Sequence, residues 1–299
     1  MVNYEYYKVF YYACKYMNFT KAAGALGTSQ SSVSHTIQTL EYQLGCRLFT
    51  RSNRGIKLTP EGKQLYKYVA AGCEQFIKGE NELMSGLQME QGVVYLAATE
   101  TALNCFLFNA LNDFRSIYPN IKFKIENLTT YSAAEAVKSG VSDFAILSTP
   151  LKINKPLVEK KLIEFSDVLI GGIYYKDLWH KEMELSALLD YPYISICSGT
   201  ATRAFYDAFL EKHKLYITPD IEVATTDMIM PMVKNNMGIG FIPHLMINEE
   251  DQEVHIIPLR KMMQKRSINI VYNMSTPKSP AAKTFINFMI NEDIRRHES

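Results

Sequence analysis

The stretch TKAAGALGTSQSSVSHTIQTLEYQLG contains two helix-forming blocks, and a glycine follows each of them. Thr20 can cap the first helix and Gly27 can end it, because threonine accepts hydrogen bonds from free helix N–H groups and glycine readily adopts the left-handed conformation. By the same reasoning, Ser29 caps the second helix, which runs to about Leu44 and ends at Gly45. The sequence therefore predicts two short helices joined by a tight turn.

A further helix and a hairpin flank this pair. Apolar residues recur at helical spacing before it, namely Tyr6, Phe10, Ala13 and Met17. After Gly45, the run RLFTRSNRGIKLT alternates on both sides of Ser52–Gly55, which predicts a two-stranded hairpin. Three helices followed by a hairpin indicate a winged helix-turn-helix domain over residues 1–60.

Thr59 and Pro60 favour the start of a long helix, since threonine can cap a helix and proline is tolerated in its first turn. Its apolar residues follow a three-four spacing that only Glu80 interrupts: Leu65, Val69, Cys73, Phe76, Leu83 and Leu87. Residues 60–90 are therefore predicted to form a linker helix that pairs two chains, as in a coiled coil. The alternative is a helix packed on its own domain, because Gly72 and Gly79 each weaken a free helix by about 1 kcal/mol relative to alanine.

From residue 91 the pattern changes to apolar strands that alternate with helices. The runs VVYLAAT, IKFKIEN and DFAILS, with helices between them, predict a parallel sheet with right-handed crossovers. A second series extends from DVLIGGI to IGFIP, and the strand SINIVYN and a helix close the chain. Residues 91–299 are predicted to fold as a two-lobed α/β domain, with lobe I at about 91–160 and 267–299 and lobe II at about 161–266.

The formal net charge of +1 hides an uneven distribution. Residues 1–60 carry two acidic residues, Glu5 and Glu41, against a larger basic set: Lys8, Lys15, Lys21, Arg47, Arg51, Arg54 and Lys57. The remainder of the chain is slightly acidic. A basic unit joined to an acidic one indicates a polyanionic partner for the N-terminal part only.

The sequence lacks the motifs that are typical of several classes of protein. The N-terminus has no signal-peptide pattern and no stretch approaches the length of a membrane span, so we expect a cytoplasmic protein. The five cysteines form no CxxC pair, which fits free thiols. No catalytic motif or metal-ligand spacing occurs, so we expect no enzyme activity, metal or cofactor. A redox switch at Cys105 or Cys197 is a less favoured alternative.

The helix that follows Ser29 has two contrasting faces. One is an apolar stripe that is predicted to pack on the first two helices: Val33, Ile37, Leu40 and Leu44. The other carries uncharged hydrogen-bonding side chains: Gln30, Ser31, Ser34, His35 and Gln38. Glutamine can pair with adenine through two hydrogen bonds, and such a helix reads the major groove with its N-terminal turns. The alternative is an ordinary solvated polar face.

Basic side chains near this helix complete the candidate DNA-binding site. Arg51, Arg54 and Lys57 of the predicted hairpin can contact phosphates or enter the minor groove. Lys21 and Ser29 belong to the same candidate set, at the starts of the two short helices.

A longer pattern runs from Phe10 to Gly62 without an internal gap. It consists of Phe10, Phe19-Thr20-Lys21-Ala22-Ala23, Leu26, Ser29-Gln30, Val33-Ser34, Ile37, Leu40-Glu41, Leu44-Gly45, Leu48-Phe49, Arg51 and Leu58-Thr59-Pro60-Glu61-Gly62. This pattern resembles the N-terminal domain of LysR-type transcriptional regulators. Local runs farther along are similar to the same family: Tyr118-Pro119, Gly140, Asp143-Phe144-Ala145-Ile146, Gly238-Ile239-Gly240 and Ile242-Pro243.

The resemblance implies a dimerising linker helix, a homotetramer and a periplasmic-binding-protein-like effector domain. It also implies double-stranded DNA with an interrupted palindrome, A/T-rich in its half-sites, and RNA polymerase as a further partner. Two residues depart from the family pattern. Ser31 stands where proline is frequent, and His35 stands where arginine or lysine is frequent, so the base preference at these positions is left open.

Hydroxyl-bearing side chains follow several predicted strands, at points where helices begin. Because ligands of such domains bind beyond the carboxyl ends of the strands, and helix N-termini favour anions, we expect a small polar cleft there. The candidate effector-binding residues are Thr99, Glu100, Thr101, Ser148, Thr149, Ser198, Thr200, Thr202 and Thr226. The hydroxyls suit a carboxylate, whereas Glu100 favours an amino group. The alternative is that each hydroxyl only caps its own helix.

Together these features predict a sequence-specific DNA-binding regulator that is controlled by a small-molecule effector between the two lobes. Residues 92–299 alone would also fit a two-lobed solute-binding protein, which the N-terminal module and the missing signal peptide oppose. An enzyme that uses the N-terminal module only for dimerisation is the least favoured alternative.

Overall fold

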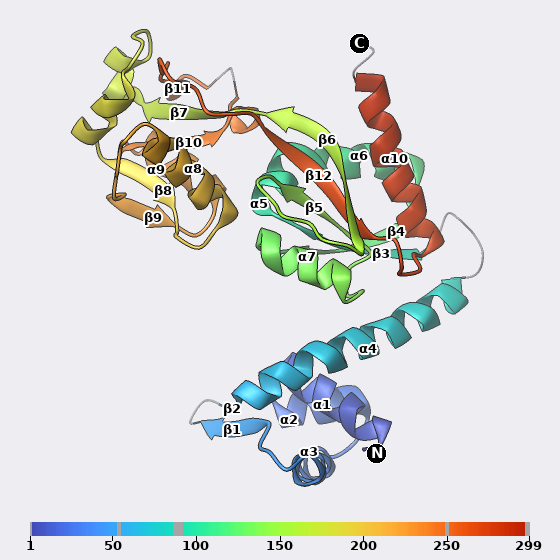
Figure 1. Ribbon diagram of the computed structural model, residues 1–299. Helices are drawn as coiled ribbons and strands as arrows, with labels where there is room; N and C mark the ends of the chain where they lie inside the picture. The colour runs from blue at the N-terminus through green and yellow to red at the C-terminus, as the bar shows by residue number, and fades with distance from the viewer. Residues whose placement is uncertain (1, 53–54, 86–91, 249–250, 297–299) are drawn as a thin grey trace. The chain divides into compact units, whose positions relative to one another are not determined.

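The computed structural model describes residues 2–52, 55–85, 92–248 and 251–296, which form two compact units, Met1–Met84 and Ser85–Ser299 (Figure 1). Each unit has its own hydrophobic core. Within the described ranges, no helix combines the length and the apolar character needed to cross a membrane.

The first unit is a winged helix-turn-helix domain followed by a long helix, which confirms the predicted fold class. Its elements are α1 (Tyr4–Tyr16), α2 (Phe19–Leu26), α3 (Gln30–Leu44), β1 (Phe49–Ser52), β2 (Gly55–Leu58) and α4 (Pro60–Ser85). Strands β1 and β2 pair antiparallel, with Phe49 opposite Leu58. The predicted caps of α3 are confirmed, because Ser29 Oγ accepts from the Ser32 N–H at 3.1 Å and Gly45 has a φ of 71°.

The predicted N-cap of α2 is wrong. Asn18, not Thr20, caps this helix, and its Oδ1 accepts from the Lys21 N–H at 3.0 Å. The helix starts at Phe19, whose ring packs edge-on against Phe49 with ring centroids 5.5 Å apart. This packing favours the earlier start, and asparagine is at least as good an N-cap as threonine.

Helix α4 is packed in its first half and exposed farther along. As predicted, Thr59 Oγ1 caps it by accepting from the Gly62 N–H at 2.9 Å. Side chains on one side of the first half pack against the core of the unit: Leu65, Val69, Cys73 and Ile77. By contrast, Phe76 and Leu83 are 69% and 85% exposed. Leu87, the last residue of the predicted stripe, lies outside the described residues.

Lobe I of the second unit is built on a five-stranded sheet with the order β4-β3-β5-β12-β6. Its strands are β3 (Gly92–Ala98), β4 (Ile121–Asn127), β5 (Phe144–Ser148), β6 (Leu157–Phe165) and β12 (Arg266–Asn273); its helices are α5 (Glu100–Ala102), the π-helix η1 (Leu103–Leu107), α6 (Phe108–Ile117), α7 (Thr130–Lys138) and α10 (Pro280–Arg296). Strand β3 runs parallel to β4 and β5, whereas β12 is antiparallel to β5 and β6.

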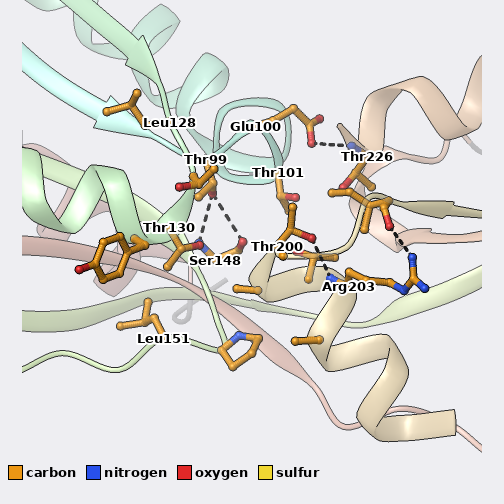
Figure 2. Close-up of a pocket in the computed structure, with 18 of the residues that line it drawn as sticks. Thr99, Glu100, Thr101, Leu128, Thr130, Ser148, Leu151, Thr200, Arg203 and Thr226 are labelled. Atoms are coloured by element: carbon orange, nitrogen blue, oxygen red, sulfur yellow. Dashed lines mark hydrogen bonds between the residues drawn. The ribbon is translucent and has the colours of Figure 1, made fainter. Parts of the chain in front are cut away.

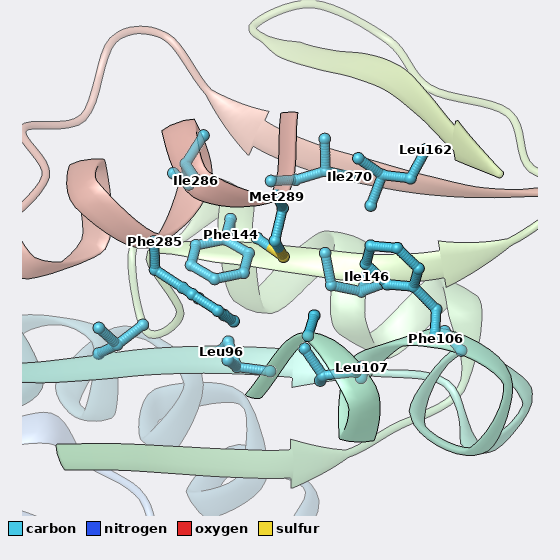
Figure 3. Close-up of a cluster of buried hydrophobic side chains, with 14 of the residues drawn as sticks. Leu96, Phe106, Leu107, Phe144, Ile146, Leu162, Ile270, Phe285, Ile286 and Met289 are labelled. Carbon is cyan, nitrogen blue, oxygen red and sulfur yellow. The ribbon is translucent and has the colours of Figure 1, made fainter. Parts of the chain in front are cut away.

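The two faces of the lobe I sheet are covered by different helices. Side chains from α6 and α10 form one core with the sheet, in which Phe285 and Met289 lie over Leu96 and Ile146 (Figure 3). Helix α7 covers the other face through a smaller cluster that includes Ala133. The central strands β3, β5 and β12 are therefore mostly buried on both sides, as their apolar sequences require.

Lobe II is built on a second five-stranded sheet with the order β11-β7-β10-β8-β9. Its elements are β7 (Asp167–Gly172), η2 (Ile173–Leu178), η3 (Leu185–Asp190), β8 (Tyr193–Ile196), α8 (Ala201–Lys212), β9 (Ile221–Val223), η4 (Thr226–Met228), α9 (Ile229–Lys234), β10 (Ile239–Pro243), η5 (His244–Met246) and β11 (Val254–Ile256). Strand β8 is parallel to β9 and β10, and β7 is antiparallel to β10 and β11.

The chain passes between the two sheets twice. Strand β6 ends at Phe165 in lobe I, and β7 begins at Asp167 in lobe II; the chain returns to lobe I with β12 at Arg266. The sequence placed these crossings near residues 160 and 266. Strands β6 and β11 are additional elements that the sequence pattern did not indicate.

Candidate functional site

The polar face of α3 is exposed as its spacing predicts. Gln30, Ser31, His35 and Gln38 are exposed, and Ser34 is half-buried. The Ser31 hydroxyl lies 2.8 Å from the Ser29 hydroxyl, so it is tied to the N-cap of the helix. The two glutamines and His35 are therefore the side chains of this face with polar groups most available to a partner.

The buried face of α3 differs from the prediction at its C-terminal end. Val33, Ile37 and Leu40 are buried, but Leu44 is 37% exposed. Glu41 is buried instead and is 7% exposed. Its Oε1 accepts from the backbone N–H groups of residues 48 and 49 at 2.7 and 3.1 Å, and its Oε2 pairs with the residue 47 guanidinium at 2.9 Å. This carboxylate fastens α3 to the segment that leads into the hairpin.

The basic candidates lie on both sides of α3 in the chain. Lys21 is exposed on α2 and Lys57 is exposed on β2. The backbone of Arg51 forms part of β1. The side chain of Arg51 and all of Arg54 lie outside the described residues.

A cavity of about 700 Å³, the cleft, lies between lobe I and lobe II (Figure 2). The predicted effector residues that line it are Thr99, Glu100, Thr101, Ser148, Ser198, Thr200, Thr202 and Thr226. Thr149 is not among the lining residues, and its Oγ1 accepts from the Ser267 N–H at 2.8 Å. The volume falls within the range of about 300–1,000 Å³ typical of small-molecule sites.

The hydroxyls of the cleft play different roles. Thr200 caps α8, because its Oγ1 accepts from the Arg203 N–H at 3.1 Å, so the helix-cap alternative holds for this residue. Thr99 makes no cap hydrogen bond; its Oγ1 accepts from the Ser148 N–H at 3.3 Å. Thr226 is 1% exposed, and its Oγ1 has no hydrogen-bond partner among the described residues. The cap alternative therefore fails for Thr99 and Thr226.

Glu100 connects the two lobes. It lies at the start of α5 in lobe I, and its Oε2 accepts from the Thr226 N–H of lobe II at 3.2 Å. Its Oε1 accepts from the Asn104 side chain, one turn farther along the chain. Burial raises the pKa of Glu100, with Asp227 adding to the effect. The contact therefore favours one arrangement of the lobes at the expense of a partly desolvated carboxylate.

A buried ion pair lies behind the cleft, where the chain crosses between the lobes. Arg266 Nη1 is 3.1 Å from Asp167 Oδ2, and both residues are buried. The Tyr206 hydroxyl donates to Asp167 Oδ1 at 2.8 Å, and burial raises the pKa of Tyr206 well above its usual value. The guanidinium also lies over the rings of Phe165 and Phe205, at 5.1 and 5.2 Å from their centroids.

The sequence pattern missed one wall of the cleft. This wall belongs to lobe I and consists of Leu128, Thr129, Thr130, Tyr131, Leu151 and Ile153. Two further lining residues that were not predicted, Arg203 and Asp207, belong to lobe II. Residues 128–131 directly follow β4, which neighbours β3 in the parallel sheet. The rule that ligands bind beyond parallel strand ends applies to β4 as well, so its position was the signal that could have found this wall.

The cysteines of the second unit give no support to a redox switch. Burial raises the pKa of Cys105 to about 12, which keeps it a thiol at neutral pH. Cys197, like Cys105, is a free thiol. Among the described residues, no group of three His, Cys, Asp or Glu side chains is placed to hold a metal ion.

Comparisons with known proteins match both units. Residues 5–63 match the family described as "bacterial regulatory helix-turn-helix protein, lysR family", and residues 87–293 match the "LysR substrate binding domain". The uncharacterized HTH-type transcriptional regulator YybE of Bacillus subtilis is 27% identical over 97% of this chain and 99% of its own length. A probable RuBisCO transcriptional regulator of Phaeodactylum tricornutum is also 27% identical, over 90% of each chain.

Solved structures share the fold over nearly the whole chain. CbnR, a LysR family transcriptional regulator, superposes with a TM-score of 0.76 at 14% identity, covering 98% of this chain and 99% of CbnR. Full-length CbnR complexed with its target DNA gives a TM-score of 0.74, also at 14% identity, over 97% and 99% of the two chains. A full-length OxyR variant from Pseudomonas aeruginosa gives 0.69 at 16% identity, over 98% and 95%.

Proposed function

The chain belongs to the LysR family of DNA-binding transcriptional regulators, and we propose that a small molecule bound in the cleft controls how its first unit engages DNA. Members of this family are transcriptional regulators rather than enzymes. The observation that carries the proposal is the cavity of about 700 Å³ whose lining comes from both lobes. A ligand that touches both lobes can prefer one arrangement of them, which is the condition for shifting an equilibrium.

The contacts between the lobes supply the element that a ligand can bias. Glu100 in lobe I holds the Thr226 N–H of lobe II, and both residues line the cleft. A ligand that bridges the lobes supports this arrangement, and one that displaces the contact opposes it. In either case, ligand affinity and lobe arrangement are coupled, as linkage requires.

We propose that DNA is read by the exposed face of α3. Gln30 and Gln38 have the donor and acceptor pair that recognises adenine, and His35 can bond to a base edge or a phosphate. Ser34 belongs to the same face, whereas the Ser31 hydroxyl is engaged by Ser29 and serves mainly to order the helix start. Lys21, Arg51, Arg54 and Lys57 are the proposed phosphate contacts.

We further propose a homodimer formed through residues 60–90, assembled into a homotetramer. The exposed Phe76 and Leu83 of α4 provide apolar surface for pairing. Two identical units read two half-sites, which accounts for an interrupted palindrome as the target. RNA polymerase is the proposed protein partner of the assembled regulator.

DNA footprinting of the full-length chain tests the DNA-reading part of the proposal. The probe is DNA from upstream of the protein's own gene, across a series of salt concentrations, and the expected result is protection of an interrupted palindrome. Gln30→Ala should reduce discrimination between sequences, whereas Lys57→Ala should weaken binding to all sequences alike. Absence of protection at every salt concentration would contradict the proposal.

Two substitutions on α8 test the cleft. Ala204 lines the cleft, whereas Ala208, one turn farther along the same helix, is exposed and does not line it. Ala204→Trp should fill the cavity and abolish the effect of cell-extracted metabolites on the footprint, while binding to DNA persists. Ala208→Trp is the matched control and should respond like the unmodified chain. Equal behaviour of the two variants would exclude the cleft as the effector site.

A further inference from the structure

Every nitrogen of the buried Arg266 guanidinium has a hydrogen-bond acceptor. Nη1 donates to Asp167 Oδ1 and Oδ2 at 3.3 and 3.1 Å, and Nε donates to the Thr149 carbonyl oxygen. Nη2 donates to Ser148 Oγ at 3.3 Å and to Thr202 Oγ1 at 2.8 Å. One nitrogen therefore holds a hydroxyl from lobe I and a hydroxyl from lobe II, and both of these residues line the cleft.

This arrangement fixes the direction of hydrogen bonding in the lining of the cleft. A guanidinium cannot accept a hydrogen bond, so Ser148 and Thr202 must both accept from Arg266 and keep their own O–H groups to donate elsewhere. Thr99 and Ser148 share one hydrogen bond at 3.5 Å, which leaves one O–H of this pair free. Thr202 Oγ1 has no acceptor among the described residues. Each lobe thus offers one hydroxyl donor to a molecule in the cleft.

A second observation points to a ligand in the same place. Thr226 is buried and lines the cleft, yet its Oγ1 has no partner among the described residues. Native proteins rarely leave a buried hydroxyl unpaired, so a bound molecule that pairs with it removes an energetic cost.

The opposite wall of the cleft includes an apolar group of side chains beside the polar Thr129, Thr130 and Lys152. Leu128, Leu151 and Ile153 line it from lobe I. Figure 2 shows Leu128 and Leu151 across the cleft from Thr226. A ligand that fits both walls has a polar end that accepts hydrogen bonds and a hydrocarbon body.

Glu100 does not favour an amine in its present arrangement. Figure 2 shows its carboxylate turned toward Thr226 and away from Ser148, and its two oxygens already accept from the Thr226 N–H and the Asn104 side chain. Each of these oxygens keeps a further acceptor position, but an ammonium beside Ser148 and Thr202 would meet hydroxyls that donate, whereas a carboxylate there meets free donors.

We propose that the effector is a small carboxylic acid with an apolar body. Its carboxylate accepts from Thr202 and from the Thr99–Ser148 pair, and its body packs against the leucines of lobe I. Arg266 is a positioning residue, because it does not touch the ligand but makes both hydroxyls donors. This inference rests on the proposed function, which places an effector in the cleft.

Isothermal titration of the full-length chain tests the inference with matched probes. Hexanoate, 4-methylpentanoate and phenylacetate are each compared with their primary amide and their primary amine. At least one acid should bind about tenfold or more tightly than its own amide and amine, because hydrogen bonds to a charged acceptor are stronger than those to a neutral one. Thr202→Val should weaken the acid by about tenfold, whereas Thr202→Ser keeps the donor and should restore binding.

The outcomes separate the inference from the proposed function. Tighter binding of an amide or amine, absence of binding by every acid at millimolar concentration, or equal acid affinity in Thr202→Val would overturn the inference. If the metabolite response is then still abolished by Ala204→Trp, the cleft remains the effector site for a ligand of another class. Arg266→Gln provides a second readout, because its amide oxygen can accept from these hydroxyls: the preference for acid over amide should fall, whereas a purely structural role would lower both affinities alike.

Discussion

Asp167→Asn should destabilise the C-terminal unit by about 3–5 kcal/mol, the usual cost of leaving a buried charge without its partner. Asp167 and Arg266 are 6% and 2% exposed, so water cannot replace the lost carboxylate. Arg266 Nη1 lies 3.3 Å from Asp167 Oδ1 and 3.1 Å from Asp167 Oδ2. An asparagine at this position keeps the shape but removes the charge, and its amide nitrogen cannot accept from the guanidinium.

Asp207→Asn is the matched control. Asp207 pairs with Arg203 Nε at 2.7 Å, but its side chain is 43% exposed. Exposed pairs contribute about 1 kcal/mol or less, so this substitution should have a small effect.

The fluorescence of Trp179 provides the assay. It is the only tryptophan of the chain and lies in lobe II, where its Nε1 donates to the Gly171 carbonyl oxygen at 3.1 Å. Its signal therefore follows unfolding of the C-terminal unit. The predicted loss corresponds to a fall in Tm of about 6–20 °C for a unit of this size. A loss no larger than that of Asp207→Asn would refute the reasoning.

Further predictions concern pH dependence and close packing. Because burial raises the pKa of Glu100, the stability linked to its protonation is present below its unfolded pKa and is lost as the pH rises through its folded pKa. Glu100→Gln should therefore be more stable than the unmodified chain near neutral pH and lose this advantage in acid, as measured by melting across a pH series. Gly62→Ala places a Cβ 2.2 Å from the Leu48 carbonyl oxygen and should destabilise the first unit, whereas Gly79→Ala in the same helix meets open space and should stabilise it by about 1 kcal/mol, as followed by hydrogen exchange.

Local signals in the sequence were sufficient for most of the first unit. The Ser29 cap and the glycines at 27 and 45 fixed the ends of the short helices, because each acts through backbone groups a few residues away. The exception was Thr20, where two residues within one turn could both cap a helix. The choice of Asn18 depends on the contact between Phe19 and Phe49, which is distant in sequence.

The sequence patterns of β6 and β11, the two strands that were not predicted, are weak for physical reasons. Strand β6 contains the run Glu159–Lys161, whose charged side chains are exposed, so its apolar alternation is interrupted. Strand β11 has only three residues and is recognised through its pairing with β7. Both strands lie at sheet edges, where one side has no partner strand.

The cleft was predictable only where its residues follow strand ends. Thr99, Ser148 and Thr202 were identified in this way, whereas Thr149 was included although successive side chains near a strand point to opposite sides. The pairing of Asp167 with Arg266 joins residues 99 positions apart, and no local pattern indicates it.

The position of β12 has a consequence for how the protein is made. This strand lies between β5 and β6, yet it is synthesised after every strand of lobe II. While the chain emerges from the ribosome, lobe II has all its strands before lobe I does. Lobe I meanwhile presents the unpaired edges of β5 and β6, a surface that invites pairing with other chains. A nascent chain that stops before Arg266 would therefore carry its complete N-terminal unit beside an unfinished, aggregation-prone lobe.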